Sequence, residues 1–410
     1  MTDQEHISPF FGLPLELREQ VYRDVLASPS SAPAILSTCR EFNTEALKFL
    51  YQRPLHFRSQ CRLLKWLHST PHHLLTQVTD ISLRIQDVDL KSILVSEDTV
   101  DSARDPNQLQ TWQLYQAELD ELRQAFCKLP SIKAFGIRAS PNQQSFLYRD
   151  FITAVLDLLV ASFSDLLEMR LEGDLHHQDM TFLSRLQSLS SFTFDGFSAS
   201  TPTETASILA SLTSLRSLSL TSQYAILTPI TRRHSAFTAK RQSFTGEVAR
   251  TMSRLASFSV TEMFPTATPT LFFTSEILTS LHDHSTLNSL SVRLSHTPDT
   301  EALKALENFL ERSRIKRLEL DWPDLHPFVL EEFKLLTDNL NYLRVRARTE
   351  AYAFDILWSI AETRGAGELQ GLRKVVLIRP FLTHEGVASK VCDRKDSGTQ
   401  AFDRLLHQVG

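Results

Sequence analysis

The sequence predicts an α/β fold: a short helical N-terminal head followed by a curved solenoid of about ten strand–helix units. Apolar residues between positions 13 and 50 recur at spacings of three and four residues, which is typical of amphipathic helices. Beyond position 75, a segment with apolar residues at its first, fourth and sixth positions recurs ten times. Helical patterns, such as TEALKALENFLER at 300–312, lie between most of these hexamers.

The head is predicted to contain two helices. Pro14 suits the first turn of a helix, because the amide that proline lacks would be unpaired there. A proline- and serine-rich break at 28–33 then separates this helix from a second one. The first helix carries Leu17, Val21 and Val25, and the second carries Ile35, Cys39, Phe42, Ala46 and Phe49. Two short amphipathic helices must bury their apolar stripes against each other or against a partner.

The solenoid is predicted from the ten hexamers, whose first residues lie 23 to 54 residues apart. They are Val78-Ile81-Leu83, Ile132-Phe135-Ile137, Leu166-Met169-Leu171, Leu189-Phe192-Phe194, Leu215-Leu218-Leu220, Leu255-Phe258-Val260, Leu287-Leu290-Val292, Ile315-Leu318-Leu320, Leu340-Leu343-Val345 and Leu372-Val375-Leu377. The residue between the last two apolar positions is small or polar in nine of the ten, as expected for a strand with one solvated face. A strand followed by a helix, repeated, indicates a solenoid.

Both segments resemble known families. The hexamers are similar to irregular leucine-rich repeats over about residues 75 to 380, although Gln86, Asp174 and Gln223 stand where that family has an asparagine. The N-terminal segment resembles an F-box, in particular the abbreviated F-box-like segments common in fungal proteins. The residues that carry this resemblance are Leu13-Pro14-Leu15-Glu16-Leu17-Arg18, Val21-Tyr22-Arg23, Leu36 with Thr38-Cys39-Arg40, and Glu45-Ala46 through Leu50-Tyr51. Phe42-Asn43 replace the tryptophan that F-boxes usually carry.

The resemblance implies a division into three parts and a function in protein recognition. The head, residues 8–57, would dock a Skp-type adaptor of a cullin-RING (SCF-type) ubiquitin ligase. Its adaptor-binding residues would be Leu13, Pro14, Leu17, Val21 and Tyr22. The repeats, residues 58–380, would hold a protein substrate, and residues 381–410 would form a tail with a short helix. The alternative is an interaction scaffold in which the head only caps the solenoid and recruits no ligase.

The solvated face of the later repeats gathers basic residues. Alternate residues of a strand share one face, so the residues between the apolar positions project away from the core. The predicted partner-binding residues are Arg293, Arg317, Tyr342, Arg344, Arg346 and Lys374. Arginine forks beside an aromatic ring suit carboxylate or phosphate groups, so we expect an acidic or phosphorylated substrate segment. Alternatively, the neighbouring Glu319 and Asp321 neutralise the arginines, and the face is an ordinary solvated one.

Composition disfavours several other functions. A formal charge of −5 gives no overall attraction to nucleic acid or to anionic membranes, and no run of about 18 apolar residues suits a membrane helix. The glycine group Gly365-Ala366-Gly367 fits a helix end better than a phosphate-binding loop. Histidines, cysteines and serines lack the spacings of metal sites or nucleophile motifs. We therefore expect no enzyme activity and no catalytic, cofactor-binding or metal-ligating residue. The four widely separated cysteines favour a reducing compartment, the cytoplasm or the nucleus.

Two segments are predicted to be insertions. Residues 87–105 are acidic and have no regular pattern, and residues 223–250 are basic and rich in hydroxyl groups. The basic segment is either a tolerated surface loop or a site for phosphorylation or a partner.

Overall fold

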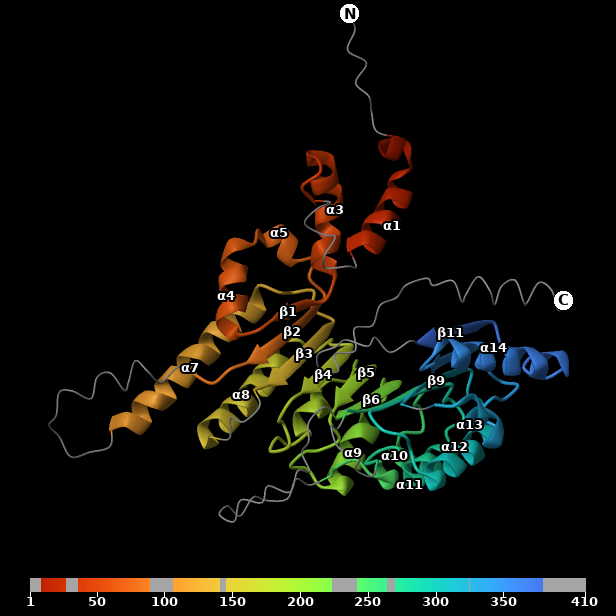
Figure 1. Ribbon diagram of the computed structural model, residues 1–410. Helices are drawn as coiled ribbons and strands as arrows, with labels where there is room; N and C mark the ends of the chain where they lie inside the picture. Colours follow the sequence, from red (N-terminus) through yellow and green to blue (C-terminus); the bar gives the residue numbers. More distant parts are fainter. Residues whose placement is uncertain are drawn as a thin grey trace, which may run out of the picture. The chain divides into compact units, whose positions relative to one another are not determined.

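The computed structural model describes residues 9–26, 36–88, 106–140, 145–222, 242–263, 270–323 and 325–378. The chain forms two compact units, Met1–Arg170 and Leu171–Gly410. Eleven strands lie in the described residues, and they are ordered in space as they are ordered along the chain (Figure 1). The predicted α/β fold of alternating strands and helices is thereby confirmed. The proposed boundaries at 57 and 380 stay predictions, and the predicted tail at 381–410 lies outside the described residues.

The head contains two helices that pack on each other, which is one of the two arrangements expected from the sequence. A short 3-10 turn, η1 (Pro9–Gly12), precedes α1 (Leu15–Leu26), and α3 spans Arg40–Gln52. The Pro14 carbonyl accepts the amides of Leu17 and Arg18 in the first turn of α1, and the Cys39 thiol caps α3 by accepting from the Phe42 amide at 3.5 Å. The core between the helices contains Tyr22, Leu26, Ala46 and Phe49. Ile35, predicted to belong to the second helix, lies outside the described residues.

The rest of the first unit alternates strands with helices. In chain order the elements are β1 (Leu55–Phe57), α4 (Gln60–Ser69), α5 (His72–Leu75), β2 (Asp80–Ile85), α7 (Pro106–Cys127), β3 (Ala134–Ala139), α8 (Phe146–Ser162) and β4 (Glu168–Glu172), which spans the division between the units. β1 pairs with β2, and β2 with β3, all parallel.

A long ion pair braces the solvated face of this unit. Arg170 on β4 reaches Asp80 on β2, with its Nη1 atom 3.1 Å from Oδ2 and its Nη2 atom on Oδ1. The guanidinium passes over Gly136 on β3, where an added Cβ would lie 3.4 Å from Arg170 Nε and 3.1 Å from Ser82 Oγ. Burial, the largest single cause, disfavours the charged guanidinium, but the hydrogen bonds and negative charges of Asp80 and Glu168 together outweigh it and raise the pKa of Arg170.

The second unit repeats the same strand–helix pattern with shorter helices. Its elements are η3 (Thr181–Arg185), β5 (Ser191–Phe194), α9 (Pro202–Ser211), β6 (Ser217–Ser222), α10 (Gly246–Thr251), β7 (Ser257–Glu262), α11 (Ser275–Leu281), β8 (Ser289–Leu294), α12 (Thr300–Arg312), β9 (Arg317–Asp321), α13 (Pro327–Glu332), β10 (Tyr342–Arg346), α14 (Glu350–Gly365) and β11 (Lys374–Ile378). Helices α9 to α12 pack side by side, and Figure 1 shows them following a curve on the outer side of the strands.

The ten predicted hexamers coincide with β2 to β11. Every apolar residue of the hexamers is buried except Leu377, which is partly exposed on the last strand. Two differences from the sequence prediction concern neighbouring elements. β1 is an additional strand, and part of the predicted insertion at 223–250 is the repeat helix α10, which buries Val248 and Ala249. Gly367 follows the end of α14 with a φ of 96°, which suits glycine, as predicted for a helix terminus.

At most of the repeats, one carbonyl accepts two amides from the next repeat. The Ser190 carbonyl accepts the amides of Arg216 and Ser217, each at 2.9 Å, and the Arg216 carbonyl accepts those of Ala256 and Ser257. The same double acceptance occurs further along at Ala256, Asn288, Lys316 and Asn341, and in the first unit at Thr79 and Lys133. These main-chain bonds link the repeats without a ladder of asparagine side chains.

The fold predicts a large contrast between neighbouring positions of β6. Leu218→Ala removes a fully buried side chain and should lower the free energy of unfolding by about 2–5 kcal/mol. Ser219→Ala, one residue along on the solvated face, should change it by less than about 0.5 kcal/mol. Urea denaturation of the two variants measures both values. Equal effects would contradict the assignment of inward and outward faces.

Candidate functional site

The first candidate surface lies on α1 and the turn before it. We call Leu13, Pro14, Leu15, Leu17 and Val21 the α1 surface. Its leucines and valine are between 39% and 49% exposed, and Pro14 is exposed as well. Large apolar side chains at this exposure form a patch that is suited to association with another protein.

The opposite side of α1 is fixed by aromatic packing. Phe10, Phe11 and Tyr22 surround the ring of Phe42 on α3, with ring centroids 5.0, 5.0 and 5.7 Å away. Tyr22 also lies 6.4 Å from Phe49. This packing holds α1 against α3, so the α1 surface is presented by a helix of fixed orientation.

A polar cluster joins the same two helices. Glu45 on α3 accepts hydrogen bonds from Arg18 Nη2 at 2.8 Å and from the Tyr22 hydroxyl at 2.9 Å. Arg18 Nη1 donates to the Phe11 carbonyl at 2.9 Å, which ties the turn before α1 to the helix. Burial, followed by the hydrogen bond to Glu45, raises the pKa of Tyr22 to about 12, so its hydroxyl remains a donor at neutral pH.

Tyr22 therefore differs from the other predicted adaptor-binding residues. It is 1% exposed and faces α3, whereas Leu13, Pro14, Leu17 and Val21 face outward. Successive residues of a helix are turned by about 100°, so Tyr22 points away from the side that Val21 occupies. Tyr22 supports the α1 surface from below. Leu15, which the sequence prediction did not include, belongs to the surface.

The second candidate surface is on the solvated side of β8 to β11. We call Arg293, Arg317, Tyr342, Arg344, Arg346 and Lys374 the arginine face. The strand register sets Arg317, Tyr342 and Lys374 in one row, and it sets Glu319 beside Arg344. The structure thus brings the six predicted partner-binding residues together on four neighbouring strands.

Two carboxylates lie within the arginine face. Glu319 contacts Arg317 at 2.6 Å and Arg344 at 3.4 Å. Asp321 contacts Arg293 at 3.2 Å and also pairs with Arg346. The five cations and two carboxylates leave a formal charge of +3, so the carboxylates neutralise the face only in part.

The cations of this face are not equally accessible. Arg317 is 53% exposed and lies over the Tyr342 ring, 4.2 Å from its centroid. Lys374 is also exposed and lies 5.8 Å from the same centroid. Arg346 is only 19% exposed because it is held against Asp321. Arg317 and Lys374 are therefore the cations that a partner would meet first.

Two other kinds of site are absent from the described residues. No group of three or more histidine, cysteine, aspartate or glutamate side chains in those ranges could hold a metal ion. Likewise, no helix within the described part of the chain is long and apolar enough to span a membrane.

No family model matches the chain, and no curated protein matches it. Among solved structures, the complex of Rad7 and Elc1 from yeast is 12% identical, with a TM-score of 0.37, over 84% of this chain and 79% of the matched chain. A protein from Bacteroides fragilis is 11% identical, with a TM-score of 0.32, over 76% of this chain and 68% of that one. TM-scores this low do not bear on what the chain binds.

The ion pairs of the arginine face predict a stability effect. Asp321→Asn removes the charge that holds Arg293 and Arg346, and Asp321 is only 11% exposed. Since hydrogen bonds to charged groups contribute about 1.5–3 kcal/mol, the free energy of unfolding should fall by about 1–3 kcal/mol. Asp283→Asn, at a side chain that is 84% exposed, is the control and should have almost no effect. Urea titration compares the two, and indistinguishable curves would show that Asp321 contributes nothing.

Proposed function

We propose that this protein is a non-catalytic recognition subunit and a candidate substrate receptor of a cullin-RING (SCF-type) ubiquitin ligase. The α1 surface binds a Skp-type adaptor, and the repeats hold a protein substrate. Ubiquitin transfer is then performed by the partners, and this chain contributes binding alone.

The observation that carries the proposal is the exposure of the α1 surface. A short helix has little apolar surface, and α1 uses one side for its core with α3 while it leaves Leu13, Leu15, Leu17 and Val21 outside. Apolar side chains on one side of a helix are suited to a groove on a partner protein. This supports adaptor docking over the alternative in which the head serves as a cap, because a cap would bury these side chains against the repeats.

The arginine face is the proposed substrate-binding surface. Its formal charge of +3 contrasts with the charge of −5 on the whole chain, so it is a local region of positive potential. Arg317 and Lys374 are exposed on either side of the Tyr342 ring and can each pair with a carboxylate or a phosphate. The preferred substrate segment is therefore acidic or phosphorylated.

Adaptor binding can be tested with purified proteins. The wild-type chain, co-expressed with a Skp-type adaptor, should elute with it in size-exclusion chromatography and then retain a cullin. Leu13→Ala combined with Leu17→Asp should abolish this complex, because it puts a charge into the apolar contact. Leu167→Asp, at a leucine that is 43% exposed outside the head, is the matched control and should retain it. Absence of a wild-type complex would favour the scaffold alternative.

Substrate binding can be tested separately from adaptor binding. The wild-type chain should capture substrate proteins from a lysate of the source cells. The double variant Arg317→Glu with Lys374→Glu should fail to capture them. The double variant Leu13→Ala with Leu17→Asp should still capture them. Their recovery should also fall with rising salt, since charge pairing at a surface is screened. Lys304→Glu with Arg312→Glu makes the same charge change at exposed positions of α12 and serves as control. If quantitative mass spectrometry finds the same proteins with both pairs, the arginine face is not the substrate site.

A further inference from the structure

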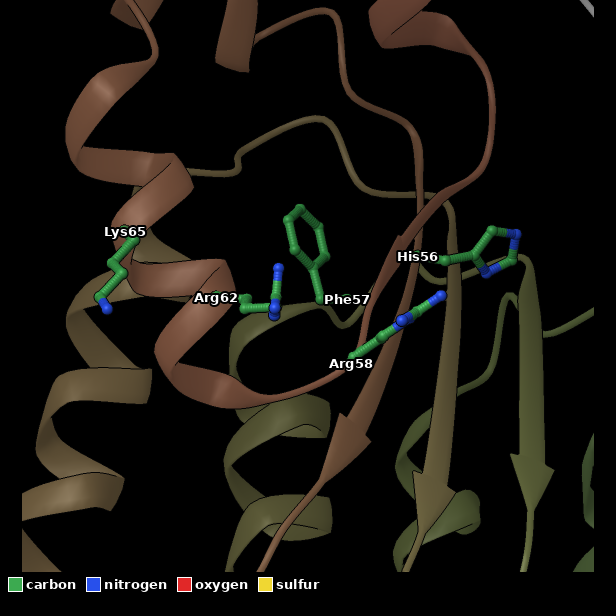
Figure 2. Close-up of a pocket in the computed structure, with 5 residues that line it drawn as sticks. All are labelled: His56, Phe57, Arg58, Arg62 and Lys65. Carbon is green, nitrogen blue, oxygen red and sulfur yellow. The ribbon is translucent and has the colours of Figure 1, made fainter. Parts of the chain in front are cut away.

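A basic hollow lies between β1 and α4 in the first unit. It has a volume of about 380 Å³ and is lined by His56, Phe57, Arg58, Arg62 and Lys65. Figure 2 shows Arg62 and Lys65 projecting from α4 and the ring of Phe57 beside Arg62, while His56 and Arg58 project on the side of the strand away from α4. Four of the five lining side chains thus carry basic groups.

The local sequence fixes the walls of this basic hollow. Ser59 caps α4 by accepting from the Arg62 amide at 3.3 Å, so the helix begins immediately after β1. The side chain of Gln60 donates to the Gln86 carbonyl at 2.8 Å and accepts from the Gln86 amide at 3.0 Å, which fastens the start of α4 to the chain after β2. Arg62 and Lys65, three residues apart, consequently share the side of α4 that faces the hollow.

Packing between aromatic rings supports the floor of the basic hollow. The ring of Phe57 lies 5.1 Å from that of Trp66, which lies 6.1 Å from that of Tyr51. All three side chains are partly buried. The strand and the helix are therefore held together beneath the cations, and the hollow does not depend on attraction between its charged residues.

The cations of the hollow have no acidic partner among the described residues. Within the ranges that the structure describes, no carboxylate pairs with Arg58, Arg62, Lys65 or His56. The arginine face differs, because two carboxylates contact its four arginines. Several like charges held in one hollow repel one another, and an anionic ligand would relieve that repulsion.

β1 adds a second feature that points to the kind of ligand. It is the first strand in the sheet order and pairs with β2 on one side. No strand of the described residues pairs with its other edge, which carries His56 and Phe57 of the hollow. An extended peptide can pair with such an edge, whereas a small anion would use the side chains alone.

We propose that the basic hollow binds an extended peptide segment that carries a phosphorylated serine or threonine. The phosphate lies among Arg58, Arg62 and Lys65, and the peptide main chain runs along the edge of β1. A phosphate group carries a charge of about −1.5 to −2 at pH 7 and three acceptor oxygens, so it can meet three cations at once and brings more negative charge than a single carboxylate. This site is separate from the α1 surface and the arginine face and does not depend on the proposed ligase function.

The probe for this proposal is a fluorescein-labelled mixture of ten-residue peptides with a central phosphoserine and random flanking residues. In fluorescence anisotropy, the full chain should bind this mixture at least tenfold more tightly than the same mixture with serine. Arg62→Glu with Lys65→Glu should remove that preference. Lys128→Glu with Lys133→Glu makes the same charge change at exposed positions where α7 ends and β3 begins, and should preserve it. Arg317→Glu with Lys374→Glu should preserve it too, which separates the hollow from the arginine face.

Several outcomes would overturn the proposal. They are an absence of phosphate preference in the wild-type chain, an unchanged preference after charge reversal in the hollow, or loss of preference only when the arginine face is reversed.

Peptides with methylated backbone amides should bind more weakly, and equal binding would refute pairing along β1. Sedimentation with phosphatidylserine vesicles that depends on Arg62 and Lys65, without peptide preference, would assign the site to membranes instead. If the charge-reversed variant melts early, Arg62→Gln with Lys65→Gln replaces it.

Discussion

The double acceptance of amides by one carbonyl, at most of the repeats, is the constraint on which the rest of the solenoid depends. At Ser190, Arg216 and the equivalent later positions, this bond fixes the offset between one strand and the next. Within each unit, residues at equivalent positions then lie beside one another, so apolar side chains stack in the core and polar side chains form rows. The arginine face is a direct result, because Arg317, Tyr342 and Lys374 occupy equivalent positions. Variation in the length between strands does not alter these rows.

Most of the fold could be predicted because its signal is periodic. Within each hexamer, the apolar residues are spaced as in a strand that has one buried face, and the ten hexamers coincide with β2 to β11. β1 was missed because Leu55 and Phe57 alternate over only three residues, too few to distinguish from chance. α10 was missed because its six residues carry little apolar pattern of their own and acquire burial from neighbouring helices.

The candidate sites were predictable to different degrees. The rows of the arginine face followed from strand register, but which carboxylate would hold which arginine depended on side-chain geometry across strands. Tyr22 was assigned to the outer surface because spacing alone does not reveal which side of α1 meets α3. The basic hollow could not be predicted, since it requires a helix and a strand edge to meet. The spacing of Arg58, Arg62 and Lys65 directly after a strand was the only signal available.

The brace between Arg170 and Asp80 has a consequence for how this chain can change during evolution. The guanidinium crosses β3 at the one position on its path, Gly136, that has no side chain. A Cβ added there would press on Ser82 Oγ at 3.1 Å and touch Arg170 Nε at 3.4 Å, so a side chain larger than that of alanine would have to displace one or both. Once the arginine was displaced, the aspartate would lose its partner as well. These three positions lie on three different strands and should therefore vary together. Related sequences should either keep all three residues or replace them together.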